Sequence, residues 1–189
     1  MNAHASSLTA RPGIAASYGR SLLARIGFLP ALLIAVVIGM SAVDPQFYGP
    51  INIINILRNT ALLTIVACGQ ALVIIGGGFD LSVGAVVALA SVVTAKAMGL
   101  IAASFPGNDA LIIAGGLAAG LGSGAAVGLI NGLCVARLKV SGFVVTLGTM
   151  SATAGVALMI TSGIPVYGMP QSFVRDFGRA QFFGLPTAI

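Results

Sequence analysis

The sequence has very few charged residues and no glutamate. Charged residues make up 7% of the 189 residues, and the four acids are all aspartates. An ordinary soluble domain is about 25% charged. So few charges cannot cover the water-facing surface of a soluble fold of this length, and hydrophobic residues reach 58%. The composition therefore excludes a soluble globular domain and predicts a protein whose solvent is lipid.

Cation clusters, histidine clusters and a cysteine framework are also missing. The nine lysines and arginines lie scattered at the ends of apolar runs, which does not suit nucleic-acid binding and does suit contact with membrane lipid. Cys68 and Cys134 lie in separate apolar runs without metal-ligand spacing, and we expect them to be small packed side chains. With only His4 and four dispersed acids, neither a nucleophile–base pair nor a metal site can be assembled. The alternative of a membrane-embedded enzyme is therefore disfavoured.

What the sequence has instead is long uncharged runs. The second run has 21 residues, or roughly 31 Å of helix, which matches the hydrocarbon thickness of a bilayer. The first run could also be a cleaved signal peptide, but its basic leader is long and further spans follow, so an uncleaved helix is favoured. We expect an all-α integral membrane protein, a bundle of about five transmembrane helices, at residues 26–43, 59–79, 81–105, 110–136 and 143–164.

The two ends differ from the spans. Residues 1–25 are basic and contain no acid, so we expect a cytoplasmic leader. Residues 165–189 combine charges, prolines and aromatic rings, and are expected to be an extracytoplasmic or interfacial segment with a short amphipathic helix near residues 171–177. With a cytoplasmic leader, alternating spans place Asp80 on the cytoplasmic side and Asp109 outside.

A row of glycines marks the fourth run. Four residues advance about 400° around an α-helix, so glycines at this spacing form one groove along a helix face. Within a membrane such a groove lets a neighbouring backbone approach closely, which predicts helix packing and carries no information about a solute. The row consists of Gly116, Gly120, Gly124, Gly128 and Gly132.

The join between the second and third runs is the most informative segment of the chain. Its sequence is Gly76-Gly77-Gly78-Phe79-Asp80-Leu81-Ser82-Val83-Gly84. Three consecutive glycines weaken a helix, and Asp80 and Ser82 are both good N-cap residues. Two interpretations stay open. The segment is either a capped helix start in a tight reversal, or a broken helix beside a transport path in which backbone N–H groups hold Asp80 partly buried.

Two polar side chains within the runs have a similar ambiguity. Gln70 could line a path for a solute, but hydrogen bonding between helices is the more common role. Lys96 lies about 14 Å of helix from Phe105, so its long stem can carry the ammonium group outward to the interface. Neither residue is therefore assigned to a site.

The glycine-rich join resembles the Gly-Gly-x-Asp-Leu-Ser-Val-Gly signature of bacterial sugar-type ABC importer permeases, the ribose/xylose/arabinose permease group. Further stretches are similar to this family in the same order, over a region from about residue 52 to residue 186. They are Asn131-Gly132, the run from Phe143 to Thr149, and the run from Gly155 to Val166.

Some positions depart from the family pattern. Phe79 replaces a common isoleucine and Ser141 a common proline. Ala154 stands where the family often has an arginine, which puts an anchoring role for that position in doubt. Family permeases are also longer, with about ten helices. The chain is therefore expected to be the N-terminal portion of a permease, and a truncated nonfunctional fragment is the alternative.

The resemblance implies the transmembrane permease subunit of an ATP-driven monosaccharide importer in the bacterial cytoplasmic (inner) membrane. The implied partners are a second permease subunit in a homo- or heterodimer, cytoplasmic ATPase subunits and an extracytoplasmic sugar-binding protein. No catalytic residue, cofactor or metal is expected in this chain. The residues assigned to the translocation path and family motif are Gly77, Gly78, Asp80, Leu81, Ser82, Gly84, Thr146 and Thr149.

Overall fold

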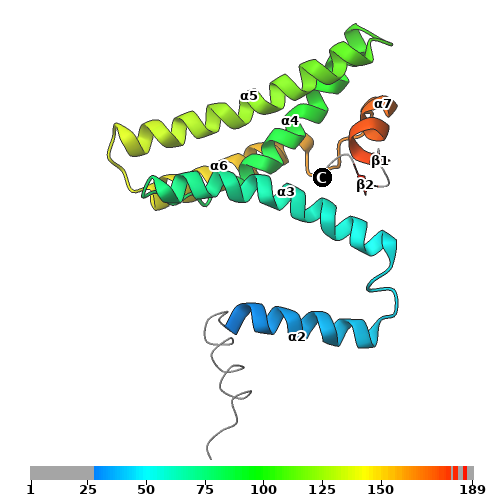
Figure 1. Ribbon diagram of the computed structural model, residues 1–189. Helices are drawn as coiled ribbons and strands as arrows, with labels where there is room; N and C mark the ends of the chain where they lie inside the picture. Colours follow the sequence, from blue (N-terminus) through cyan, green and yellow to red (C-terminus); the bar gives the residue numbers. More distant parts are fainter. Residues whose placement is uncertain (1–27, 180, 183–184, 187–189) are drawn as a thin grey trace, which may run out of the picture. The chain divides into compact units, whose positions relative to one another are not determined.

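The computed structural model describes residues 28–179, 181–182 and 185–186, with side chains as far as residue 176. The expected leader, residues 1–25, lies outside the described residues. The chain divides into two compact units, Met1–Ile53 and Ile54–Ile189, and each is described by itself. In the described part of both units, every long element is an α-helix (Figure 1).

The first unit contains α2 (Phe28–Val43), an apolar helix of 16 residues. Its end is followed by a turn in which the carboxylate of Asp44 accepts a hydrogen bond of 2.8 Å from the backbone N–H of Gln46. The next helix, α3 (Pro50–Ile75), begins in this unit and continues into the second.

Helix α3 begins earlier than the sequence predicts. It starts at Pro50 rather than at residue 59, because proline fits the first turn of a helix and does not interrupt it. Arg58 therefore lies within the helix instead of before it. The helix ends at Ile75, where the glycines begin, and Gly77 adopts a left-handed conformation with φ of 74° that favours glycine.

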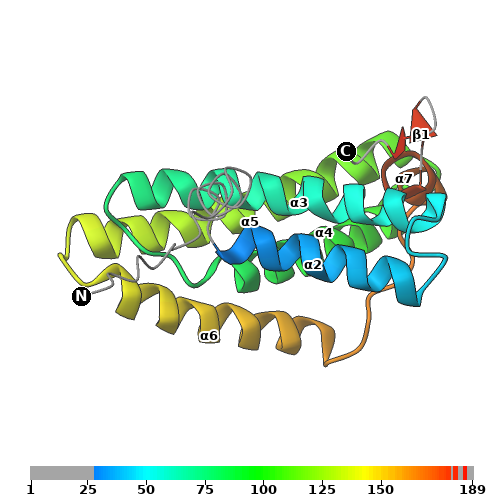
Figure 2. The ribbon, with the colours of Figure 1, turned by 60° about the horizontal axis from the view of Figure 1, so that its bottom comes forward.

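The second unit is built around three further helices, α4 (Val83–Ser104), α5 (Asp109–Ala136) and α6 (Gly142–Thr161). Helix α4 packs most extensively against α5, which runs antiparallel to it, and then against α6, which runs in the same direction (Figures 1 and 2). The side chain of Asn108 caps α5 by accepting a hydrogen bond from the N–H of Leu111. Helices α3 to α6 are all long and apolar enough to cross a membrane.

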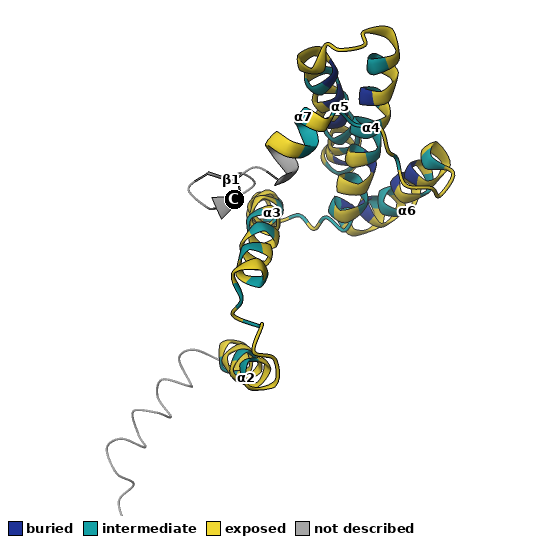
Figure 3. Cartoon of the chain, turned by 90° about the vertical axis from the view of Figure 1, so that its right-hand side faces the viewer, coloured by how far each residue is buried: buried dark blue, intermediate teal, exposed yellow. Residues whose placement is uncertain are grey.

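In the part of the chain that the structure describes, the buried residues lie in α4, α5 and α6 or, in the case of Ser82, directly before α4. Among the described residues, the buried apolar side chains are few and come from these three helices, whereas α2 and α3 contain no buried residue (Figure 3). Large apolar side chains cover the outer faces, for example Leu121, Leu129 and Met159. A bilayer solvates such faces, so this distribution fits a multi-pass membrane protein.

The glycine row on α5 meets α4 over part of its length. Gly116 and Gly120 are buried, and a Cβ atom on Gly120 would overlap the Thr94 hydroxyl and approach the carbonyl oxygen of Ala90 to 3.0 Å. A Cβ on Gly124 would meet a Val86 methyl group at 3.7 Å. The last two glycines of the row, Gly128 and Gly132, have no neighbouring atom within 4 Å of such a Cβ.

After α6 the chain continues to the start of α5. Helix α7 (Gln171–Phe173) starts where the sequence predicts a short helix and continues as a π-helical turn, Val174–Arg179. The Ser172 hydroxyl donates to a carboxylate oxygen of Asp109 at 2.5 Å, which ties this segment to the start of α5. Two strands of two residues each, β1 (Gln181–Phe182) and β2 (Leu185–Pro186), pair antiparallel.

Candidate functional site

The loop between α3 and α4 is organised by the carboxylate of Asp80. One oxygen, Oδ1, accepts hydrogen bonds of 2.7 Å from both the backbone N–H and the hydroxyl of Ser82. Ser82 occupies the N-cap position of α4, but its hydroxyl makes no capping bond because it is directed to Asp80 instead. The helix start is thus held by an acidic side chain from two residues earlier, and that carboxylate is half-buried.

From Ser82 the hydrogen bonds continue into α5 and α6. Ser82 is completely buried, and its Oγ accepts a hydrogen bond of 3.0 Å from Nδ2 of Asn131 on α5. The Oδ1 atom of Asn131 accepts in turn from the Thr149 hydroxyl on α6 at 2.6 Å. These four residues, Asp80, Ser82, Asn131 and Thr149, are called the polar cluster below. The cluster connects the loop with the starts or sides of three helices.

Two more side chains hold the main chain of the same loop. The Thr146 hydroxyl, which is buried on α6, accepts from the backbone N–H of Leu81 at 3.1 Å and donates to the Gly142 carbonyl at 2.7 Å. On the other side, Nε2 of Gln70 on α3 donates to the Asp80 carbonyl at 2.6 Å. Gln70 thus bonds to the loop rather than to another helix, and the loop is fixed to α3 and α6 at once.

A cavity of about 290 Å³ opens beside the polar cluster. Among the described residues that line it, there is one carboxylate, that of Asp80, and there are the polar side chains of Asn131 and Thr146, but no positively charged side chain. Glycines and apolar side chains form the remaining wall, so most of the lining surface is apolar. The lining is completed by Val73, Gly78, Phe79, Gly128, Gly132, Val135 and Gly142.

The structure brings together most of the residues that the sequence assigned to a path. Asp80, Leu81, Ser82, Thr146 and Thr149 all take part in the hydrogen bonds just described. The glycines of the motif are more dispersed. Gly78 lines the cavity, Gly77 forms the exposed left-handed turn after α3, and a Cβ on Gly84 would meet no atom within 4 Å.

Asn131 is the member of the polar cluster that the sequence did not assign to the path. It belongs to the Asn-Gly pair noted above, but only the fold places it between Ser82 and Thr149. A usable signal was present, since an asparagine within an uncharged membrane run needs a hydrogen-bonding partner on another helix.

Neutral donors and acceptors surround a single carboxylate, and they are positioned by hydrogen bonds to one another and to the main chain. Among the described residues, no group of three histidine, cysteine, aspartate or glutamate side chains lies close enough to hold a metal ion.

An ion pair lies apart from this site, in the segment after α7. A hydrogen bond of 2.7 Å from Nε of Arg175 lowers the pKa of the Asp176 carboxyl below its ordinary value. Both side chains are largely exposed, so solvent screens the pair and it stabilises the fold little.

Comparison with known proteins places the chain among membrane permeases. Residues 52–184 match the family described as the permease component of the branched-chain amino acid transport system. The chain belongs to this family. The matched region includes α4, α5, α6 and the whole polar cluster.

Its curated relatives include several sugar permeases. The ribose import permease protein RbsC of Bacillus subtilis is 37% identical over 167 residues, which cover 88% of this chain and 49% of the relative. The galactofuranose transporter permease protein YtfT of Escherichia coli is 43% identical over 148 residues, which cover 77% of this chain and 39% of the relative. The L-arabinose transport system permease protein AraH of Escherichia coli is 34% identical over 145 residues, which cover 77% of this chain and 41% of the relative. The chain thus spans about half the length of the relatives, or less, and no solved structure matches it significantly.

Proposed function

We propose that this chain is a transmembrane permease subunit of an ATP-driven importer for a monosaccharide, and that it provides part of the translocation path. The observation that carries the proposal is the polar cluster beside its cavity. Sugar permeases among the relatives support the substrate class, since those proteins are named for ribose, galactofuranose and L-arabinose.

The cluster has the properties expected of a moving part in a permease. Polar backbone is tolerated at membrane depth only where protein or a water-filled space surrounds it, and the Asp80 loop meets that condition beside the cavity. The loop is held by discrete hydrogen bonds to α3, α5 and α6, and such bonds can be exchanged between two arrangements. An outward-open and an inward-open state would differ in which of these bonds are made.

The proposal includes partners and an orientation. ATP hydrolysis takes place on separate cytoplasmic subunits, an extracytoplasmic binding protein delivers the sugar, and a second permease subunit completes the path. The chain lies in the bacterial cytoplasmic membrane with residues 1–25 on the cytoplasmic side. The Asp80 loop then faces the cytoplasm and Asp109 faces outward.

The test is sugar uptake by the complete transporter carrying Asp80→Ala. This substitution removes the acceptor for both Ser82 bonds, so we expect uptake to be abolished while the protein still inserts and accumulates in the membrane. Asp44→Ala is a matched control, because Asp44 also accepts the backbone N–H two residues later but lies in an exposed turn. Normal uptake by the Asp80→Ala protein, at normal membrane levels, would refute the assignment.

A further inference from the structure

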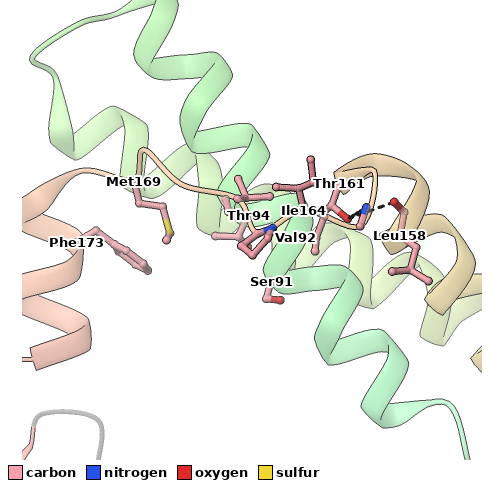
Figure 4. Close-up of a pocket in the computed structure, with 12 residues that line it drawn as sticks. Ser91, Val92, Thr94, Leu158, Thr161, Ile164, Met169 and Phe173 are labelled. Carbon is pink, nitrogen blue, oxygen red and sulfur yellow. Dashed lines mark hydrogen bonds between the residues drawn. The ribbon is translucent and has the colours of Figure 1, made fainter.

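A second, larger cavity of about 520 Å³ lies where the chain leaves α6, away from the polar cluster. Figure 4 shows the loop after α6 passing along α4, with Met169 and Phe173 at one end of the cavity and Leu158 and Thr161 at the other. The side chains of Ser91, Val92 and Thr94, from α4, lie between them. We call this space the outer cavity. It lies within the second unit and is lined by twelve residues from α4, α6, the following loop and α7.

The outer cavity contains three hydroxyl side chains with unused hydrogen-bonding capacity. Ser91 donates to the Ala88 carbonyl of its own helix at 2.8 Å, and its oxygen can still accept. Thr161 donates to the Ala157 carbonyl at 3.0 Å and already accepts from the N–H of Gly163 at 3.2 Å, so one lone pair of its oxygen stays open. Thr94 differs from the threonines on α6, since within the described part of the chain its hydroxyl makes no hydrogen bond. Its hydroxyl oxygen faces Gly120 on α5. Helical threonine populates two χ1 rotamers, so bonding to a ligand in the cavity requires the side chain to change rotamer.

The rest of the wall is apolar and includes an aromatic ring. Val92, Ile164 and Pro165 contribute aliphatic surface, while Met169 and Phe173 contribute a thioether and a phenyl ring. Concave sites for small molecules commonly have this composition, a mainly apolar wall with a few placed polar groups. A ligand that fits must therefore present both hydroxyl groups and an apolar face. A sugar ring does so, because its C–H groups gather on a face of the ring.

The lining also discriminates between two classes of solute that the comparisons raise. The family is described by branched-chain amino acid transport, whereas the relatives reported above are named for sugars. A free amino acid carries an ammonium and a carboxylate group, and both need charged or multiple polar partners when they leave water. No lysine, arginine, aspartate or glutamate is among the twelve lining residues. The cavity therefore suits an uncharged solute.

We propose that the outer cavity is a binding site for a monosaccharide in its ring form. The site rests on the proposed sugar-import function and adds a second position for the solute, at the middle of α4 and the end of α6, roughly three helical turns beyond the Asp80 loop. In the orientation proposed above it lies on the outward side of that loop, so an incoming sugar reaches it before the polar cluster. Phe173 stacks against the C–H face of the ring, and Thr94 bonds one of its hydroxyls.

The absence of tryptophan from the sequence allows a direct test. Phe173→Trp places the only indole of the chain at the cavity, and the purified full chain is titrated in lipid nanodiscs. We expect a saturable change in tryptophan fluorescence with ribose or L-arabinose, and none with leucine at equal concentrations. The control is Phe28→Trp, an exposed position at the start of α2, which should not respond to either solute.

A second substitution tests the assigned hydrogen bond. Thr94→Val keeps the shape of the side chain and removes the hydroxyl, so in the Phe173→Trp protein it should raise the half-saturating sugar concentration about fivefold. Thr64→Val, at an exposed threonine that bonds within α3, should leave that concentration unchanged.

Two results would overturn the site. One is the absence of a saturable sugar response both in Phe173→Trp and in a second probe, Met169→Trp, which covers the chance that the first indole blocks the ligand. The other is a response to leucine equal to that for sugar. Asp80-dependent uptake without sugar binding here would remove this site and keep the proposed function. Sugar binding at the outer cavity together with normal uptake by the Asp80→Ala protein would keep this site and refute the function assigned to the polar cluster.

Discussion

Asn131 bonds to residues of α6 and of the start of α4 at once, from a position five residues before the end of α5. Its amide donates to Ser82 and accepts from Thr149, and its side chain is almost completely buried. If the Asn131 amide were removed, neither Ser82 nor Thr149 could replace the hydrogen bond with one to water, because the hydrocarbon region contains no water. The amide therefore determines how the starts of α4 and α6 are positioned against α5, which a side chain of similar size without polar atoms would not do.

Asn131→Leu should lower the free energy of unfolding by about 1–2 kcal/mol, because it removes two interhelical hydrogen bonds and leaves the Ser82 hydroxyl with fewer partners. The measurement is unfolding of the purified chain in mixed micelles of increasing SDS content, followed by circular dichroism. Asn55→Leu is the matched control, at an exposed position of α3, and should change stability little. Equal stability of the two variants would show that the polar cluster contributes nothing to holding the helices together.

At the scale of whole elements, the glycine row gives a prediction that differs along one helix. Gly120→Ala forces a methyl group onto Thr94 and against the Ala90 carbonyl, so it should destabilise the α4–α5 pair by about 1–3 kcal/mol. Gly128→Ala adds the same methyl group in open space and should be neutral or slightly stabilising, since alanine favours helix. The same SDS titration compares the two, and a Gly120→Ala protein as stable as Gly128→Ala would exclude close packing at this point.

The same row shows how far the sequence could lead. Spacing identifies the face on which the glycines lie, but where the neighbouring helix leaves that face depends on the tertiary fold, so the open positions of Gly128 and Gly132 could not be foreseen. Long apolar runs predicted α4 to α6 well, because hydrophobic length decides such helices. Treating Arg58 as a boundary displaced the start of α3, since one cation does not end a helix. The contacts of Gln70 and Asn131 also needed the fold.

At the scale of the whole molecule, the distribution of burial is that of a protein solvated by lipid. The second unit buries little apart from small, polar and a few apolar residues between its helices, while large apolar side chains face outward (Figure 3). A soluble protein would gain stability mainly by removing those side chains from water. Here the bilayer does that, and close packing with interhelical hydrogen bonds has to hold the helices together.

The orientation of these helices across the membrane is testable by cysteine labelling. After Cys68 and Cys134 are replaced by alanine, Ser104→Cys at the end of α4 and Leu138→Cys after α5 place single thiols at opposite ends of α5. Both substitutions leave every charge in place, so the cations that orient the spans are unchanged. In intact bacterial cells, a membrane-impermeant maleimide should label the Ser104→Cys protein, whereas the Leu138→Cys protein should react only after the membrane is permeabilised. The opposite pattern would invert the proposed topology and place the Asp80 loop outside. Labelling of both thiols in intact cells would mean that α5 does not cross the membrane.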